Sequence, residues 1–509
     1  MRSRRRKLVL AAAPIAAAGL ATVAILSPGG GPGHPAHRPL PAPGPTIVQD
    51  DAEVLHRPTA RVRTTMQTLR ALGVDWLRVT ANWSFIAPSP ASPGRPRFDA
   101  TDPAAYPPGS WAKLDRAVRA AHAAGLDVMI DVAFWAPRWA VAQPSRPSDR
   151  QRNDIDAAAF GQFATAVARR YSGHYHRLPA AVGFTIWNEP NFRVFLLPQW
   201  RRAGPGWEVA SADEYRAMVY AAVPAIRRQA PRALVLIGGT AAKGTDTPAT
   251  SNDAVPPLRF LRALACVDDS LQPIHTGACA SFHPLPGDGW AHHPYAPRVP
   301  PDRSDPQPDT ASIADMSRLT DLLARLQAAG RIRNPLPVYL TEFGYETNPP
   351  DPTQPATLAD QARWLPEAEA IAHGTPGVRG FAQFLLRDLP IHAGRTAAEE
   401  WSDFQSGLEL PTGEPKPAMR SFAYALAVRR REGGRIEAFV HVRPGHGRRR
   451  VRIVARAPGG SSSVRGEART DQDGFATLAL TGDPGATFRL ELADGDAWKT
   501  VGAAVAGAS

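Results

Sequence analysis

Residues 183–191 read GFTIWNEPN, an apolar, strand-like run that leads directly into a polar Asn-Glu-Pro corner. The apolar side chains suit a strand that is covered on both faces. Pro190 has no N–H group to donate, so a central strand cannot continue through it, and we expect strand pairing to stop near Glu189. The pattern predicts a buried strand with a carboxylate at its end. For this stretch alone, a surface glutamate at a strand end is the alternative.

A second stretch, residues 338–345, repeats this arrangement with the sequence VYLTEFGY. An apolar strand is followed by Glu342, and Gly344 permits a tight exit from the sheet. In a parallel α/β barrel the carboxyl ends of all strands lie on one face, so carboxylates far apart in sequence can meet across one cleft. Glycosidic bonds are hydrolysed by such pairs, one carboxyl group acting as general acid/base and the other as nucleophile or base. Glu189 and Glu342 are therefore the candidate catalytic residues.

The Asn-Glu-Pro corner and the later Thr-Glu-Phe-Gly segment resemble the (β/α)8 glycoside hydrolases of clan A, most closely families 5 and 39. The resemblance extends over most of residues 47–428. It implies that Glu189 is the acid/base at the end of strand 4 and Glu342 the nucleophile at the end of strand 7. The implied enzyme is a retaining β-glycosidase acting on an oligo- or polysaccharide without a cofactor. A transglycosylase and a catalytically silent barrel that binds cell-surface polysaccharide are the alternatives.

The same resemblance implies roles for residues near the two glutamates. Asn188 would contact the sugar 2-hydroxyl, unless it only caps the strand end. Arg78 matches the arginine of strand 2 that holds the nucleophile ionised, with a surface arginine as the alternative. His293 and Tyr295 occupy the place where strand 6 supplies a histidine or tyrosine near the nucleophile, unless they only pack the loop. We expect no metal role for the tandem histidines.

Three further residues are candidates for substrate binding or support. Trp135 belongs to the FWAPRW run after strand 3, which predicts an aromatic wall for sugar rings, with core packing as the alternative. Asn82 follows strand 2. Gln383 on strand 8 stands near the position where the clan often places a substrate-stacking tryptophan. Strand 3 also lacks the histidine of many family 5 members, so the sugar and linkage stay open.

Alternating strand and helix patterns between residues 47 and 428 can be counted as eight units. We therefore predict an α/β fold, a (β/α)8 TIM barrel over residues 46–428. Ser211 and Glu214 form a capping-box pattern that predicts the start of one of its helices. Short alternating strands after residue 428 predict a small β-sandwich over residues 434–505. Because Trp498 is its only tryptophan, we interpret this sandwich as a structural accessory domain.

The N-terminal residues 1–26 combine a basic start, MRSRRRK, with an apolar run rich in alanine. This pattern predicts an export segment, either a cleaved signal peptide or an uncleaved membrane anchor. Residues 27–45, rich in proline and glycine, predict a disordered linker. We therefore expect a protein that is secreted, or anchored and facing the cell exterior.

Cys266 and Cys279 are the two cysteines of the chain. In an exported protein such a close pair predicts one disulfide, with two free buried thiols as the alternative. The net charge is +12, and the basic residues are almost all arginine, with clusters at residues 2–7, 429–435 and 448–452. No nucleic-acid motif accompanies them, and no Cys/His set has metal-site spacing, so we expect neither nucleic acid nor a metal. The expected partner is a carbohydrate substrate, bound by a monomer.

Overall fold

The computed structural model describes residues 44–142, 150–394, 396–431, 435–444, 447–481, 485–502 and 505–506. The predicted export segment, residues 1–26, lies outside the described residues, as does the predicted linker except for its last two positions. None of the described helices combines the length and the apolar character that crossing a bilayer requires.

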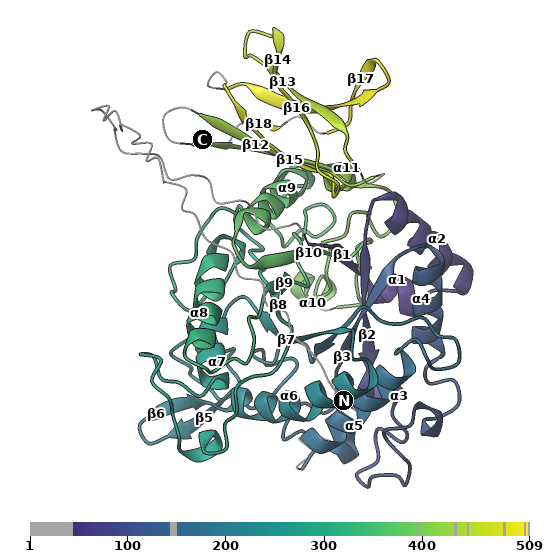
Figure 1. Ribbon diagram of the computed structural model, residues 1–509, viewed down its shortest axis with the longest axis vertical. Helices are drawn as coiled ribbons and strands as arrows, with labels where there is room; N and C mark the ends of the chain where they lie inside the picture. The colour runs from purple at the N-terminus through teal and green to yellow at the C-terminus, as the bar shows by residue number, and fades with distance from the viewer. Residues whose placement is uncertain are drawn as a thin grey trace, which may run out of the picture. The chain divides into compact units, whose positions relative to one another are not determined.

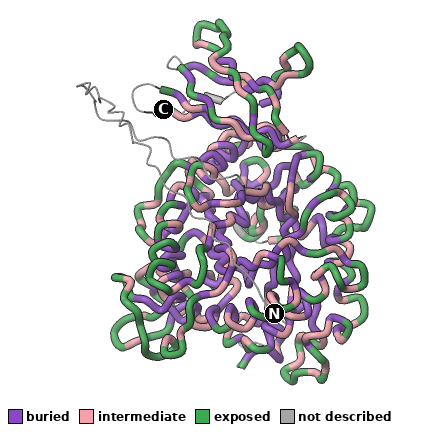
Figure 2. The backbone as a smooth tube through the Cα atoms, viewed as in Figure 1, coloured by how far each residue is buried: buried purple, intermediate pink, exposed green. Residues whose placement is uncertain are grey.

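Eight parallel strands form a closed barrel, which confirms the predicted TIM barrel (Figure 1). Figure 2 shows that buried backbone concentrates along these strands and the inner sides of the surrounding helices. In parallel sheets both strand faces are covered, which explains the nearly continuous apolar runs. The barrel strands are β1 (Thr46–Gln49), β2 (Trp76–Asn82), β3 (Asp127–Ala133), β4 (Gly183–Ile186), β7 (Leu234–Ala241), β8 (Gly289–His293), β9 (Val338–Leu340) and β10 (Val378–Phe384). They pair in the order β1-β10-β9-β8-β7-β4-β3-β2.

Helices surround the barrel (Figure 1). Two of them end at a glycine: Gly73 and Gly125 follow α2 and α4 with φ of 79° and 77°, a left-handed conformation that glycine adopts without steric cost. The helices are α1 (Asp51–Leu55), α2 (Thr59–Ala71), α3 (Trp83–Ile86), α4 (Ala112–Ala123), α5 (Ala157–Arg170), α6 (Ala210–Gln229), α7 (Pro257–Leu264), α8 (Met316–Ala328), α9 (Leu358–Gly374), α10 (Ala397–Glu400) and α11 (Pro417–Ala423).

The predicted capping box of α6 is wrong. Val209 is the N-cap residue, and its side chain makes no capping hydrogen bond. The Ser211 hydroxyl donates instead to Gln199 Oε1 at 3.2 Å, and Glu214 accepts from the Ile155 N–H at 2.7 Å. Contacts with neighbouring loops therefore replace the local cap that the sequence pattern offers.

The predicted disulfide between Cys266 and Cys279 is present, with the two Cα atoms 5.6 Å apart. It lies in the long connection between α7 and β8. Earlier in the chain, the connection between β4 and α6 contains a hairpin that the sequence patterns do not predict, β5 (Trp200–Ala203) with β6 (Gly206–Val209). Each of its strands has only four residues, which is too short for a hydrophobic alternation to stand out.

Two antiparallel sheets follow the barrel and share one apolar core, which confirms the predicted sandwich. One sheet has the order β11-β12-β15, and the other β14-β13-β16-β17, with β18 also paired to β16. The strand β14 was not predicted because its sequence, SSVRGEAR, is mostly polar and its side chains are mostly exposed. The strands are β11 (Tyr424–Arg430), β12 (Ile436–Val442), β13 (Arg450–Arg456), β14 (Ser462–Arg469), β15 (Phe475–Leu480), β16 (Thr487–Asp494), β17 (Ala497–Thr500) and β18 (Val505–Ala506).

The end of β12 contacts the base of the barrel. Arg443 is buried and donates hydrogen bonds to Glu369 of α9, to the carbonyl of Phe422 and to the Thr46 hydroxyl of β1. His441 Nδ1 lies 2.7 Å from the same Glu369 carboxylate. One buried carboxylate therefore joins the C-terminal sheets to the barrel.

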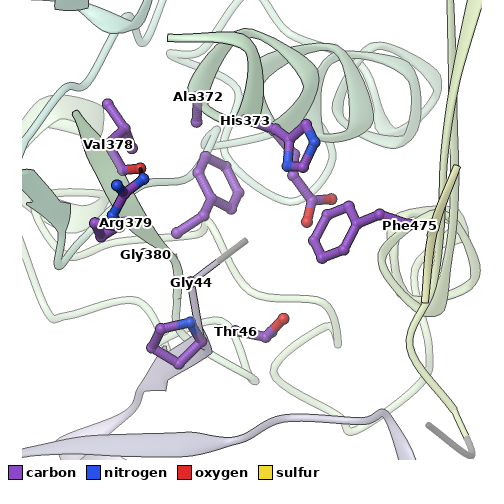
Figure 3. A pocket seen from close by; sticks show the side chains of 11 residues that line it. Gly44, Thr46, Ala372, His373, Val378, Arg379, Gly380 and Phe475 are labelled. Atoms are coloured by element: carbon purple, nitrogen blue, oxygen red, sulfur yellow. Dashed lines mark hydrogen bonds between the residues drawn. The ribbon is translucent and has the colours of Figure 1, made fainter. Parts of the chain in front are cut away.

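A small cavity of ≈ 30 Å³ lies at this junction (Figure 3). It is lined by the first residues of β1 and β10, by α9 and by Phe475, whose ring stacks on His373 with centroids 4.6 Å apart. Active sites of (β/α)8 barrels lie at the opposite, carboxyl-terminal ends of the strands. We therefore interpret this junction as structural.

Candidate active site

The corner after β4 orients the Asn-Glu pair. The strand ends at Ile186, earlier than predicted, because Trp187 and Glu189 have φ of 61° and 40° and so leave the β region. The Glu189 N–H donates to the carbonyl of Gly239 on β7 at 2.9 Å. Left-handed conformations at non-glycine residues cost free energy and concentrate at functional sites. Here they fold the chain back so that Glu189 lines the barrel mouth.

Glu342 follows β9, which is also shorter than the sequence suggests. The backbone nevertheless stays bonded to both neighbouring strands, because the Thr341 N–H donates to the His292 carbonyl at 3.0 Å. On the other side, the Phe384 N–H donates to the Phe343 carbonyl at 2.7 Å. The backbone around Glu342 is therefore fixed between β8 and β10.

The structure brings the two glutamates together at one end of the barrel. One carboxylate oxygen of Glu189, one of Glu342 and a ring nitrogen of His293 all lie within 4.8 Å of one another. His293 Nδ1 is 3.0 Å from Glu189 Oε1 and 3.6 Å from Glu342 Oε2. The imidazole therefore contacts both carboxylates.

Glu342 is held by two donors. Arg78 Nη1 lies 2.6 Å from Glu342 Oε1, and the Tyr295 hydroxyl donates to Oε2 at 3.2 Å. Arg78 is fully buried and also contacts Asn188 Oδ1 at 3.3 Å and Asp131 Oδ2 at 3.1 Å. A buried cation and a phenol donor both stabilise the ionised form of a carboxyl group.

The pKa values of the two glutamates respond differently to this environment. Burial raises the pKa of Glu189 to about 7, against the charge of Arg78, which lowers it. Burial also raises the pKa of Glu342, but His293 and Arg78 both act against that rise. Arg78 bonds Glu342 directly and so favours its ionised form. When only one of the two glutamates carries a proton, Glu189 is therefore the protonated one.

His293 is a neutral partner at neutral pH. Burial lowers the pKa of its imidazole to about 4, although the charge of Glu342 acts in the opposite direction. A neutral ring can donate from Nδ1 to an ionised Glu189 or accept from a protonated one. The ring therefore accommodates both protonation states of Glu189.

Comparison with known protein families identifies the family of this chain. The sequence profile described as "Cellulase (glycosyl hydrolase family 5)" matches residues 52–372. The chain belongs to glycosyl hydrolase family 5. The resemblance predicted from the two glutamate segments is thereby confirmed. No curated protein sequence matches the chain.

Three solved structures are similar to this family 5 chain at low sequence identity. A family 39 glycoside hydrolase from the gut symbiont Bacteroides cellulosilyticus WH2 is 16% identical, with 86% of this chain and 79% of that chain covered and a TM-score of 0.49. GH5_18 from Streptomyces cattleya, in complex with GlcNAc, is 18% identical, with coverages of 75% and 79% and a TM-score of 0.47. Exo-beta-1,4-mannosidase Op5Man5 from Opitutaceae bacterium strain TAV5 is 16% identical, with coverages of 74% and 58% and a TM-score of 0.42.

The predicted supporting residues of this family 5 protein divide into two groups. Asn188 and Tyr295 line the cavity that holds the glutamates. Arg78 and His293 lie beneath it and contact the carboxylates directly. Four of the residues that the resemblance singled out therefore surround the glutamate pair.

The others lie around the site rather than in it. Asn82 is the N-cap of α3 and accepts from the Phe85 N–H at 3.2 Å. Trp135 is half-buried, and its indole N–H donates to the Val194 carbonyl at 3.0 Å. Gln383 is fully buried and donates to three backbone carbonyls, among them that of Ser406 at 2.8 Å. The contacts of Gln383 fix backbone that lines the cavity, whereas the contact of Asn82 fixes the start of α3.

Asp131 on β3 is a site residue that the sequence patterns do not single out. It is fully buried between Arg78 and the Thr185 hydroxyl, which donates to it at 2.5 Å. Burial raises the pKa of Asp131 to about 6, while the charge of Arg78 lowers it. An aspartate inside the apolar run MIDVA is the signal that could have revealed it, because a buried carboxylate needs a partner.

The glutamates open onto a cavity of ≈ 700 Å³. Its polar lining includes Asn188, Tyr295, Asp51, Lys243, Glu346 and Asp403. The rest of its lining is largely apolar, with several phenylalanines. The cavity is large enough for a sugar ring together with the group attached to it.

Glu189, His293 and Glu342 are, among the described residues, the group whose ligand atoms lie close enough to hold a metal ion. The same atoms already make the contacts of a paired-carboxylate site: Arg78 and Tyr295 bond Glu342, and His293 bonds Glu189. We therefore interpret the cluster as a paired-carboxylate site.

Proposed function

We propose that this family 5 protein is a retaining β-glycosidase that uses Glu342 as nucleophile and Glu189 as acid/base. The observation that carries the proposal is the approach of the two carboxylates, with oxygen atoms within 4.8 Å of each other. Retaining glycosidases hold their carboxyl groups about 5–5.5 Å apart, whereas inverting enzymes leave about 6.5–9.5 Å for a water molecule. The short separation supports double displacement.

In the first step Glu342 attacks the anomeric carbon and forms a glycosyl ester. The bond to the leaving-group oxygen breaks, and Glu189 transfers its proton to that oxygen, so that an alcohol departs. In the second step Glu189 removes a proton from water, whose oxygen displaces Glu342 from the anomeric carbon. Both glutamates then return to their starting protonation states, and the anomeric configuration is retained.

The contacts of the site support this division of roles. Arg78 and Tyr295 bond Glu342, which favours the ionised state that a nucleophile needs. Burial and a raised pKa favour the protonated state of Glu189 that an acid needs. Asn188, fixed by Arg78, is placed to contact the sugar beside the glutamates.

We also propose that the protein acts outside the cell. The basic and apolar residues 1–26 support export as a secreted or anchored protein. Fractionation of the producing cells, with the activity assayed in medium, membrane and cytoplasm, tests this proposal. Activity confined to the cytoplasm would contradict it.

The stereochemistry of the first product tests the mechanism. A panel of aryl β-glycosides identifies the sugar that is cleaved, and proton NMR then follows the anomeric signals during the first turnovers. We expect the β-anomer to appear first and to mutarotate later. The α-anomer as first product would exclude double displacement at these two residues.

A further inference from the structure

We propose that the cavity takes glycosides whose leaving group is apolar, an alkyl chain or an aromatic ring, and that two apolar walls above the glutamates bind it. The inference rests on the proposed function, because it concerns the leaving group of the same reaction. It is carried by the distribution of apolar side chains around the ≈ 700 Å³ cavity.

The first wall stands beside the acid/base. Phe192, Val194 and Phe195 follow Glu189 in the chain and line the cavity, as does Phe134 after β3, the strand next to β4. The rings of Phe134 and Phe195 are in contact, with centroids 4.7 Å apart. The leaving-group oxygen must come within hydrogen-bond reach of Glu189 to be protonated. The group attached to that oxygen therefore begins beside this wall.

The second wall comes from the opposite side of the barrel. Phe384, Leu385, Leu389 and Phe404 line the cavity from the end of β10, which lies across the barrel from β4, and from the segment after it. Phe404 is 45% exposed, although its ring contacts Phe384 with centroids 5.3 Å apart. A large apolar side chain at a cavity mouth offers surface that an apolar ligand would remove from water.

A buried ion pair holds the second wall in place. Lys416 Nζ lies 2.7 Å from Asp388 Oδ2, with both side chains fully buried. The same ammonium group donates to the Thr347 hydroxyl at 2.9 Å and to the carbonyl of Gln405, next to Phe404, at 3.0 Å. Because the wall is fixed before binding, a ligand need not order it, which favours affinity.

A further sugar as leaving group fits these walls poorly. Where such a sugar meets the two walls, its hydroxyl groups would face phenylalanine, leucine and valine side chains, and a hydroxyl buried there without a partner costs free energy. The polar side chains that line the cavity, such as Lys243, Glu346 and Asp403, are not part of either wall. Among the described residues that line the cavity, none is a tryptophan. The lining therefore favours an apolar leaving group over a continuing polysaccharide chain.

Ethyl, butyl, hexyl and octyl β-glycosides of the sugar found in the aryl-glycoside panel test the inference, because their leaving groups have similar basicity. We expect kcat/KM to rise roughly two- to fourfold per methylene until the chain passes the walls, since each buried methylene contributes about 0.8 kcal/mol. In Phe404→Ala the rise in kcat/KM per methylene should be clearly smaller than in the wild type.

Phe85→Ala is the matched control, because Phe85 is 49% exposed but does not line the cavity. In Phe85→Ala, kcat/KM should depend on the alkyl chain length as it does in the wild type. Comparing a naphthylethyl glycoside with the octyl glycoside shows whether the walls prefer a ring or a chain. A higher kcat/KM for either of them than for the ethyl glycoside supports the inference.

A kcat/KM that does not change with chain length, or that rises equally in Phe404→Ala, would overturn the inference while the proposed function stands. If the protein hydrolysed no glycoside of any leaving group, the proposed function would fail and this inference with it. Hydrolysis of the ethyl glycoside therefore distinguishes failure of this inference from failure of the proposed function.

Discussion

At the scale of single residues, two glutamates of the same chemistry have different neighbours. Glu342 is bonded by Arg78 and Tyr295, whereas Glu189 is bonded by the neutral ring of His293. Two carboxyl groups this close also have separated pKa values, because ionising the second group beside the charge of the first costs free energy. The arrangement predicts that the two residues respond differently to substitution.

Glu342→Ala should abolish turnover on every substrate, by a factor on the order of 10⁵–10⁶ as found when a catalytic nucleophile is removed. Glu189→Ala removes only proton transfer, which contributes about 10²–10⁴-fold. Aryl glycosides with good leaving groups need little of that help, so Glu189→Ala should still show a burst of phenol release, followed by slow hydrolysis. Stopped-flow absorbance measures the burst.

Azide provides the second readout for this prediction. It should accelerate the slow phase of Glu189→Ala and yield the β-glycosyl azide, because a small anion needs no general base to attack the glycosyl ester. If Glu342→Ala gave the burst and the β-azide instead, the two roles would be exchanged. Wild-type rates in both variants would mean that the chemistry happens elsewhere.

The pH dependence of kcat/KM follows from the same environments. Burial raises the pKa of Glu189 to about 7, so its acid form, which the first step requires, is lost as the pH rises above about 7. We expect kcat/KM for poor leaving groups to fall about tenfold per pH unit on that side. In Glu189→Ala, assayed on an activated aryl glycoside, this basic limb should vanish. An unchanged basic limb would assign it to another group.

Much of the candidate site could be predicted from sequence, because its residues stand at strand ends within recognisable segments. Asn188, His293 and Tyr295 were found in this way, and the structure places them around the glutamates. Asn82 also follows a strand, yet its side chain caps α3. Asp131 lies inside β3, and the pairing of β3 with β2 brings it to Arg78. Tertiary contacts therefore set the direction in which each of these side chains points, and the local sequence does not show those contacts.

At the scale of elements, the segment between β10 and α11 depends on one buried ion pair. Lys416→Met would leave Asp388 buried without its cation, and breaking such a pair costs about 3–5 kcal/mol. We expect the free energy of unfolding to fall by about that amount, measured by urea denaturation. Lys499→Met, at an exposed position of β17, should change it by less than about 0.5 kcal/mol. Equal stability of both variants would show that the pair does not anchor the segment.

The sequence predicted elements well where hydrophobic periodicity was strong and poorly where it was absent. The alternating strand and helix patterns correctly predicted a barrel of eight parallel strands. The strands β5 and β6 have four residues each, too few to establish a period, and β14 is mostly polar, so their pairing partners define them. The early end of β4 could not be predicted, since it depends on left-handed backbone at Trp187 and Glu189.

At the scale of the whole molecule, the C-terminal sheets are bonded to the barrel through Glu369 on α9. Its carboxylate accepts from Arg443 and lies 2.7 Å from His441 Nδ1, with all three side chains buried. Gly73, at the end of α2, packs so closely on this segment that an added Cβ would lie 2.5 Å from the Arg443 carbonyl. The junction is therefore both tightly packed and charged.

This junction makes stability depend on pH in a defined direction. Although burial raises the pKa of Glu369, the charge of Arg443 and the contact with His441 lower it to about 2, from an ordinary value of 4.5. A carboxyl group with a lowered pKa in the folded state stabilises the fold above its unfolded pKa. We expect this contribution, about 3 kcal/mol, to be complete above pH 4.5 and to be lost as the pH falls towards 2.

Glu369→Gln should therefore lower the free energy of unfolding by about 3–5 kcal/mol at pH 7, because Arg443 stays buried without its anion. The gap, the difference in free energy of unfolding between this variant and the wild type, should narrow below pH 4.5, where the wild-type carboxylate takes up its proton. It should nearly close towards pH 2. Glu367→Gln on the same helix is the matched control: burial raises the pKa of Glu367 to about 7, so the fold does not stabilise its charge. Thermal and urea unfolding of the three proteins between pH 2 and 7 measure the gap. A gap that stays constant with pH would show that the ionisation of Glu369 does not couple the two parts of the chain.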